Sequence, residues 1–281
     1  MALKPLPGLT SPGVSLVVAV YNKPDVLSFL LAACARQSLT DFEVIVTDDG
    51  SGPAVANVVR EGENRYPYPI LHLWHEDRGW RKNIMLNNAI RAARSEYMVF
   101  IDGDCLPSRY FLEDHWSQRE LGRVLLGRRV ETSKRWSEKL TLQEVQNGGF
   151  ENLGWRGLMD GLRGDALRLE DSVRIRSRLV RNLLMRNVRG MLGSNFSVFK
   201  KDLVAVNGFD ELYHGPGCGE DSDIQYRLSL IGVTGKSMRN LAILYHLHHP
   251  ATSVSQACRK RFEDVQESRE PRCSCGLERL A

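Results

Sequence analysis

The fold class follows from one stretch of the sequence, Tyr97-Met98-Val99-Phe100-Ile101-Asp102-Gly103-Asp104. Its first five residues are large and apolar, which is the pattern of a strand buried on both faces of a parallel sheet. The apolar run stops at two carboxylates, Asp102 and Asp104, with Gly103 between them to let a ligand approach closely. Carboxylate oxygens are hard ligands that suit Mg²⁺ or Mn²⁺ bridging a diphosphate. The stretch therefore predicts a sheet with a metal site at its edge.

Strands and helices alternate on the N-terminal side of this stretch. Apolar runs predict strands, and apolar residues at helical spacing predict helices. The predicted strands are 14–20, 42–47 and 70–75, and the predicted helices are 24–37, 54–60 and 80–93. This alternation is typical of a parallel sheet with right-handed crossovers, in which ligands bind beyond the carboxyl ends of the strands. The predicted class is α/β.

Two further polar groups belong to the same half of the chain. Asp48 and Asp49 end the strand 42–47, where a carboxylate can accept hydrogen bonds from a base or ribose; an ordinary turn is the alternative. Arg81 lies near the start of the helix 80–93, and a guanidinium at a helix N-terminus suits phosphate; a plain surface helix start is the alternative. These residues indicate a nucleotide site.

The C-terminal half contains an acidic cluster and a histidine cluster. The segment 215–223 has several glycines followed by Glu220, Asp221 and Asp223 at the start of a predicted helix, 220–230. Acids at a helix N-terminus are favourable by themselves, but three in four residues exceed what capping needs, and one of them can act as a general base on a hydroxyl. After a predicted strand, 241–245, the residues His246, His248 and His249 offer a metal ligand alongside Asp104; a structural histidine is the alternative.

The segment between these halves is rich in arginine. From about residue 128 the strand pattern fades, and residues 173–189 contain six arginines and no acid, interleaved with apolar residues. These are Arg174, Arg176, Arg178, Arg181, Arg186 and Arg189. The segment is either a solvated helix face or a contact for an anionic acceptor or a membrane surface.

Composition limits the remaining classes of protein. The 281 residues are 42% hydrophobic and carry 38 basic against 34 acidic side chains, a net charge of +4 that is too small to indicate nucleic-acid binding. We expect a cytoplasmic protein, because the sequence has no signal-peptide pattern and no long apolar run. The six cysteines lack metal-binding or disulfide spacing, so we expect free thiols. The polar residues after Pro250 predict a loosely attached tail.

Taken together, these segments resemble family 2 glycosyltransferases with the GT-A fold, and the C-terminal part resembles a galactosyltransferase-type region. The likeness covers about residues 14–250. It is carried by Val14–Asn22, by Val46–Ser51, by Gly79–Asn83 and by Gly208–Glu211 with Gly219-Glu220-Asp221. The expected fold is a Rossmann-like, mostly parallel nucleotide-sugar-binding sheet flanked by helices, with a helical acceptor-side insertion.

The resemblance also implies roles for individual residues. It implies a nucleotide-sugar site formed by Ala19, Tyr21, Asp48, Asp49, Arg81, Asp102 and Gly103. It identifies Asp102 and Asp104 as the Asp-x-Asp motif that binds Mn²⁺ or Mg²⁺, with His246 as the third ligand and His248 or His249 as substitutes. It makes Asp221 the base of an inverting transfer and Glu220 an acceptor contact.

The expected function is metal-dependent transfer of a sugar from a nucleotide-sugar, UDP-linked by resemblance, to a saccharide or lipid-linked saccharide. A peripheral contact with the inner face of the membrane would suit such an enzyme; no nucleic-acid partner is expected. The expected parts are a nucleotide-sugar-binding half (1–127), an Arg-rich segment (128–190), an acceptor-binding and catalytic half (191–250) and a polar tail (251–281). The alternatives are a nucleotidyltransferase, which should carry a glycine-rich loop after the first strand, and a non-catalytic sugar-binding protein on the same fold.

Overall fold

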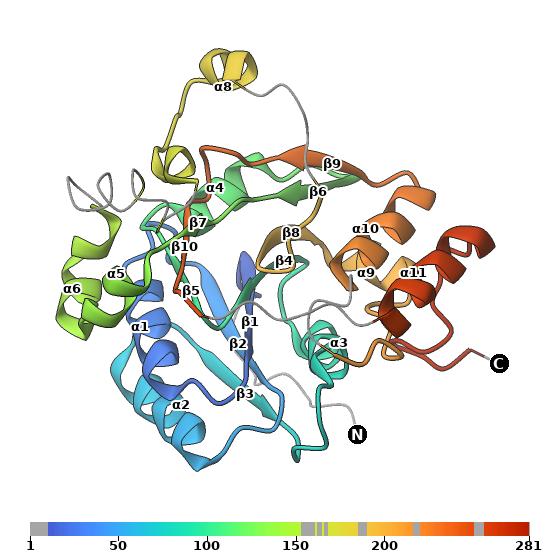
Figure 1. Cartoon of the computed structure of the whole chain (residues 1–281), viewed down its shortest axis with the longest axis horizontal. Helices are drawn as coiled ribbons and strands as arrows, with labels where there is room; N and C mark the ends of the chain where they lie inside the picture. Colours follow the sequence, from blue (N-terminus) through green and yellow to red (C-terminus); the bar gives the residue numbers. More distant parts are fainter. Residues whose placement is uncertain are drawn as a thin grey trace.

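The computed structural model describes residues 11–152, 161, 165, 168–184, 190–215, 220–249 and 256–280, which are arranged around a seven-stranded sheet (Figure 1). The strand order is β3-β2-β1-β4-β8-β6-β9. The strands are β1 (Val14–Val20), β2 (Phe42–Asp48), β3 (Ile70–Trp74), β4 (Tyr97–Asp102), β6 (Arg123–Leu126), β8 (Asn195–Phe199) and β9 (Thr234–Ser237). The first four in this order pair in parallel, and β8 pairs antiparallel with both β4 and β6. The predicted α/β class, with a mostly parallel sheet, is confirmed.

Helices cover both faces of the sheet, which explains why its central strands are apolar on both sides. One face packs against α1 (Pro24–Cys34) and α2 (Pro53–Arg65). The other packs against α3 (Lys82–Ala92), α9 (Lys200–Ala205) and α10 (Glu220–Leu230). Alternate residues of one strand serve the two cores: the neighbours Val17 and Val18 of β1, for example, lie in different clusters. The continuous apolar runs therefore predicted strands correctly.

A second, three-stranded sheet lies at the end of β4 and consists of β5 (Cys105–Pro107), β10 (Leu244–His246) and β7 (Val130–Glu131), in the order β5-β10-β7. In this sheet His246 is paired with Cys105 on one side and with Glu131 on the other. The strands β5, β10 and β7 are thus adjacent in space, and β5 directly follows the Asp-x-Asp motif in the sequence.

The remaining elements surround the two sheets. They are α4 (Phe111–Gln118), α5 (Lys134–Lys139), α6 (Leu142–Asn147), η1 (Gly149–Glu151), η2 (Leu169–Ser172), α8 (Arg178–Leu184) and α11 (Gln256–Ser268). Figure 1 shows α8 standing away from the sheets, whereas α11 lies beside α10. Among the described residues, no helix combines the length and the apolar character needed to span a bilayer.

The prediction of a loosely attached C-terminal tail is wrong for residues 256–280. Arg261 of α11 donates from Nε to Oδ2 of Asp210 at 2.8 Å, and the Asn207 side-chain amide donates to the carbonyl oxygens of Cys273 and Glu278 at 2.7 and 2.9 Å. The prediction relied on the small number of large apolar residues in this segment. The contacts that attach it are polar, so apolar content did not reveal them. The expectation of free thiols also fails at Cys258, which is disulfide-bonded, whereas Cys34, Cys105, Cys273 and Cys275 are free.

Candidate active site

The Asp-x-Asp motif lies where β4 ends, and its glycine is required by the neighbouring strand. The Gly103 amide donates to the Ala19 carbonyl oxygen at 2.7 Å, and a Cβ at Gly103 would lie 2.7 Å from the same oxygen. The expected reason for this glycine was room for a ligand, but the close approach in the structure is to the backbone of β1. The tight turn sends the carboxylates of Asp102 and Asp104 toward different partners.

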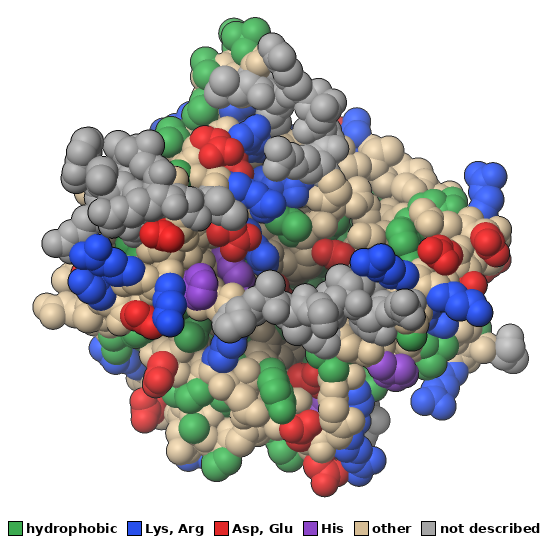
Figure 2. Space-filling model, viewed as in Figure 1, with side chains coloured by type: hydrophobic (Ala, Val, Ile, Leu, Met, Phe, Trp, Pro, Cys, Tyr) green, Lys and Arg blue, Asp and Glu red, His purple; other side chains and the backbone are tan. Residues whose placement is uncertain are grey.

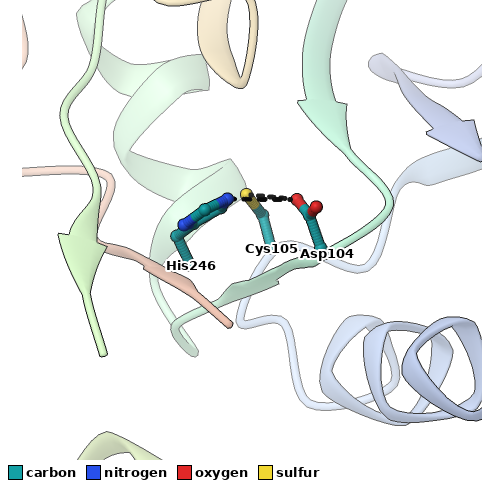
Figure 3. A group of neighbouring side chains, drawn as sticks. All are labelled: Asp104, Cys105 and His246. Atoms are coloured by element: carbon teal, nitrogen blue, oxygen red, sulfur yellow. Dashed lines mark hydrogen bonds and ion pairs between the residues drawn. The ribbon is translucent and has the colours of Figure 1, made fainter. Parts of the chain in front are cut away.

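Asp104 lies beside two histidines. Its Oδ1 is 3.5 Å from Nε2 of His246, its Oδ2 is 3.3 Å from Nε2 of His249, and the two Nε2 atoms are 3.1 Å apart. Figure 3 shows Asp104 and His246 facing each other across Cys105; one ligand atom from each of these three residues lies within 4.8 Å of the others. A carboxylate and two imidazoles converging on one point fit a divalent cation.

Burial and the surrounding charges shift the pKa values of both Asp104 and Cys105. Burial alone would raise the pKa of Asp104, but its hydrogen bond with His249 and the charges of His246 and Lys23 hold that pKa well below its usual range. Burial, helped by Asp104 and Asp102, raises the pKa of the Cys105 thiol well above its usual value. A hard cation such as Mg²⁺ or Mn²⁺ prefers oxygen and nitrogen ligands to sulfur, so Asp104 with His246 and His249 is the donor set that fits it best.

Glu131 orients one of these histidines. Its Oε2 lies 2.7 Å from Nδ1 of His246, and Arg129 donates from Nε to Oε1 at 2.8 Å. Burial opposes ionisation of Glu131, but the bond with His246 and the charge of Arg129 outweigh it and lower the pKa of Glu131 to about 2. The ionised carboxylate accepts a hydrogen bond from Nδ1–H of His246, so Nε2 is the ring nitrogen that faces Asp104 and would be offered to a metal ion. This is the carboxylate–histidine arrangement common behind metal ligands.

Replacing Glu131 by Ala is therefore expected to weaken Mn²⁺ binding by about 10- to 100-fold, the usual cost of removing such a carboxylate. Binding can be followed through the electron paramagnetic resonance signal of free Mn²⁺ during titration. Glu138→Ala is the matched control, because Glu138 is exposed on α5 and pairs only loosely with Lys134, at 3.8 Å. Equal Mn²⁺ affinities in the two variants would show that Glu131 does not support the metal site.

Lys82 joins the Asp-x-Asp motif to the acidic cluster of α10. Its Nζ donates to Oδ1 of Asp102 at 2.8 Å and lies 3.8 Å from Oε1 of Glu220. Burial would lower the pKa of Lys82, but Asp102 and Glu220 outweigh this effect and raise it. A permanent positive charge thus lies between the two groups of acids. The sequence places Lys82 with Arg81 at a helix start suited to phosphate, but its contacts with Asp102 and Glu220 are seen only in the folded chain.

The acidic cluster itself faces this lysine. The Glu220 side chain is only 12% exposed, and burial raises its pKa. Asp221 accepts a hydrogen bond at Oδ2 from the Gly193 amide at 3.1 Å and at Oδ1 from the Ser222 amide at 2.7 Å. Each carboxylate oxygen can accept more than one hydrogen bond, so Asp221 retains acceptor capacity for a hydroxyl.

The residues expected to bind the nucleotide lie at the ends of β1 and β2 and at the start of α3. Asp48 is fully buried, with hydrogen bonds to the Ser51 amide and His72; Asp49 bonds to His75 and to the Arg81 amide. Tyr21 is 51% exposed, and its hydroxyl donates to Asp77. Asp48 thus shapes the turn, whereas Tyr21 presents its ring to solvent.

His248, predicted as a substitute metal ligand, does not lie beside Asp104. His248 is exposed, and it lines a cavity of about 410 Å³ with residues of α5. His246 and His249 are the histidines that meet Asp104. On the face of the molecule shown in Figure 2, histidine side chains gather near the centre with acidic side chains around them.

Comparison with families and known proteins agrees with this arrangement. The family model "Glycosyl transferase family 2" matches residues 15–199, and the model described as "N-terminal domain of galactosyltransferase" matches residues 182–250. The chondroitin synthase of Escherichia coli is 28% identical over 250 residues, and the hyaluronan synthase of Pasteurella multocida is 26% identical over 259 residues. Each alignment covers 85% of this chain, but only 35% and 25% of those two proteins.

Solved structures share the fold at low sequence identity. A mannosyltransferase from Pyrobaculum calidifontis, in complex with GDP-Man and Mn²⁺, has a TM-score of 0.56 and 18% identity, covering 85% of this chain and 57% of that one. Residues 1–349 of TarS from S. aureus, in complex with UDP, also give a TM-score of 0.56 at 18% identity, covering 89% and 62%. These likenesses establish the GT-A fold. Because the family model spans more than half of its length, the chain belongs to glycosyl transferase family 2.

Proposed function

We propose that this protein is an inverting, metal-dependent glycosyltransferase that moves a sugar from a nucleotide-sugar to a hydroxyl of a saccharide or lipid-linked acceptor. The observation that carries the proposal is the convergence of Asp104, His246 and His249 beside an acidic cluster containing Asp221, with Lys82 between the two groups. The group around Asp104 fits a cation that binds a diphosphate, and the acidic cluster offers Asp221 as a base.

In this proposal one set of residues stabilises the leaving diphosphate and another set activates the acceptor hydroxyl. Asp104, His246 and His249 would hold Mn²⁺ or Mg²⁺, with Asp102 at the adjoining end of β4; when bound, the ion supplies Lewis-acid stabilisation of the departing diphosphate. Lys82 holds a positive charge near the transferred sugar. Asp221 accepts the proton of the acceptor hydroxyl as that oxygen attacks the anomeric carbon from the face opposite the diphosphate. Glu220 contacts the acceptor, and a single displacement inverts the configuration.

The donor would lie along the ends of β1, β2 and β4. We propose that Ala19, Tyr21, Asp48, Asp49, Arg81 and Gly103 line this part of the site, with the exposed ring of Tyr21 against the base and Arg81 at the phosphates. The Arg81 Nε atom is buried and has no hydrogen-bond partner among the described residues, which supports a role toward an anion. UDP is the proposed nucleotide, and a TarS structure of the same fold was solved with UDP.

The names of two relatives suggest which class of acceptor to propose. The two curated relatives described above are named chondroitin synthase and hyaluronan synthase, so we propose a polysaccharide acceptor related to these polymers. We also retain the proposed division into a nucleotide-sugar-binding half (1–127), an Arg-rich segment (128–190), an acceptor-binding and catalytic half (191–250) and a polar tail (251–281).

A thermal-shift screen against UDP-, GDP- and dTDP-sugars, each with and without Mn²⁺, tests the proposed donor site, because a ligand that binds the folded state raises its melting temperature. The expected result is a rise with one nucleotide-sugar that requires Mn²⁺. A rise with a free saccharide but with no nucleotide-sugar would favour the sugar-binding alternative. A rise with nucleoside triphosphates alone would favour a nucleotidyltransferase.

We also propose that the protein is cytoplasmic and touches the inner face of the membrane through α8. Two leucines of this helix are strongly exposed, Leu179 at 78% and Leu183 at 81%, and Val180 beside them is also exposed. Arg176, just before the helix, is exposed as well. Apolar side chains next to a basic residue suit an anionic lipid surface.

Changing Leu179 and Leu183 together to Ser is expected to reduce binding to phosphatidylglycerol vesicles by roughly 10-fold or more, because each leucine would lose its burial in the lipid. Co-sedimentation measures the bound fraction. Leu121→Ser is the control, since Leu121 is 66% exposed but lies outside α8. Wild-type protein that fails to sediment with the vesicles, or a double variant that sediments like the control, would contradict the proposed contact.

A further inference from the structure

A second lysine, Lys23, lies against the proposed metal ligands. Its Nζ donates to Oδ2 of Asp104 at 2.8 Å, the same oxygen that faces His249 at 3.3 Å. Lys23 therefore places an ammonium group on one of the two carboxylate oxygens that a divalent cation at this cluster could use. The two cations repel each other, so each weakens the other's hold on this oxygen.

The backbone of Lys23 is fixed, whereas its side chain is the exposed part. Asn22 has a φ of 49°, its amide donates to Ser51 Oγ at 2.8 Å, and its Oδ1 accepts from the Gly52 amide at 3.1 Å. The Lys23 carbonyl accepts from the Leu27 amide at 3.0 Å in the first turn of α1. The side chain, in contrast, is 40% exposed, and Asp104 is its ion-pair partner.

Lys82 provides an internal comparison. It is only 20% exposed and lies between two carboxylates, those of Asp102 and Glu220. Removing Lys82 would leave two partly buried acids without their shared cation. Removing Lys23 would leave Asp104 with two histidines still beside it. The Lys23 side chain can therefore leave its partner at much lower cost than Lys82 can.

We propose that Lys23 is a displaceable cation: it neutralises Asp104 in the free enzyme, gives up the carboxylate to the metal and moves onto the diphosphate of the donor. This inference rests on the proposed function, and it makes Lys23 a residue that couples metal binding to nucleotide binding. Without nucleotide, Lys23 competes with the metal for Asp104. With nucleotide present, the diphosphate offers the ammonium a new partner, and the competition ends.

The test is Mn²⁺ titration of wild-type protein and of Lys23→Met, with and without UDP, followed by the electron paramagnetic resonance signal of free Mn²⁺. Without UDP, the variant is expected to bind Mn²⁺ about 10-fold more tightly than wild type, and the factor by which UDP strengthens Mn²⁺ binding should shrink by at least the same amount. Lys23→Arg keeps the charge and should resemble wild type. Lys201→Met, which removes an exposed lysine of α9, controls for net charge.

The possible outcomes separate this inference from the proposed function. If Lys23→Met binds Mn²⁺ with unchanged or weaker affinity while wild type binds normally, Lys23 is a structural ion pair and the inference is overturned, whereas the metal site stands. If neither protein binds Mn²⁺, with or without UDP, both the inference and the proposed metal site are overturned. Melting temperatures of all variants verify that each is folded.

Discussion

Asp221→Asn should lower the rate of sugar transfer by about 10²- to 10⁴-fold, the range expected when a general base is removed. Asparagine keeps the size of the side chain but cannot take up the proton of the acceptor hydroxyl. Asp221 is held by the Gly193 amide and is not one of the proposed metal ligands, so nucleotide and Mn²⁺ affinities should be nearly unchanged. Turnover with a saturating donor, together with the dissociation constant of UDP, measures both effects.

Glu220→Gln provides the comparison for this result. Glu220 has a buried carboxylate beside Lys82 and is proposed to contact the acceptor, so its replacement should raise the KM for the acceptor more than it lowers kcat. Ser229→Ala is a control on the same helix, since Ser229 is exposed and its hydroxyl donates to the Tyr226 carbonyl oxygen rather than to either acid. If Asp221→Asn turned over normally and Glu220→Gln lost most of its kcat, Glu220 rather than Asp221 would be the base.

Asp104→Asn should lose Mn²⁺ binding by at least about 100-fold, more than the loss expected for a residue behind the ligands. The carboxylate is the anionic member of the set that it forms with His246 and His249, and an amide oxygen is a weaker ligand. Because the donor is proposed to bind through the metal, nucleotide affinity measured with Mn²⁺ should fall as well. Calorimetric titration with UDP, with and without Mn²⁺, separates the two effects.

Cys105→Ala is the matched control for Asp104→Asn. Its sulfur belongs to the same cluster, but sulfur is a poor ligand for a hard cation such as Mn²⁺ or Mg²⁺. Metal affinity should therefore be close to that of wild type. The metal assignment would be refuted if nucleotide affinity ignored both Mn²⁺ and the Asp104 substitution, or if Cys105→Ala were the variant that lost the metal.

The central sheet was predictable because a strand that is buried on both faces is a mostly apolar run in the sequence. The runs ending at Val20, Asp48 and Asp102 are mostly apolar, and the structure has strands there. The strands β5 and β7 contain three and two residues, too few to show a pattern, whereas the predicted strand 241–245 corresponds to β10, Leu244–His246. Their pairing depends on contacts between segments more than 100 residues apart, which a local pattern does not record.

The same limit explains which site residues were foreseen. Asp102, Asp104 and Asp221 stand in conspicuous acidic clusters, whereas Glu131 becomes important only because β7 pairs with β10. Lys23 was not predicted because a single lysine is usually a solvated surface residue. Only the folded chain shows that Lys23 and Lys82 each contact an aspartate of the same motif, at 2.8 Å in both cases.

The most direct test of the central claim is the stereochemistry of transfer. The protein is incubated with Mn²⁺, with the nucleotide-sugar identified by thermal shift and with saccharide acceptors related to chondroitin and hyaluronan, and the new linkage is assigned from its anomeric proton coupling by nuclear magnetic resonance. The account predicts a Mn²⁺-dependent product of inverted configuration. A product that retains the donor's configuration, or transfer that is unaffected by removing the metal, would contradict it.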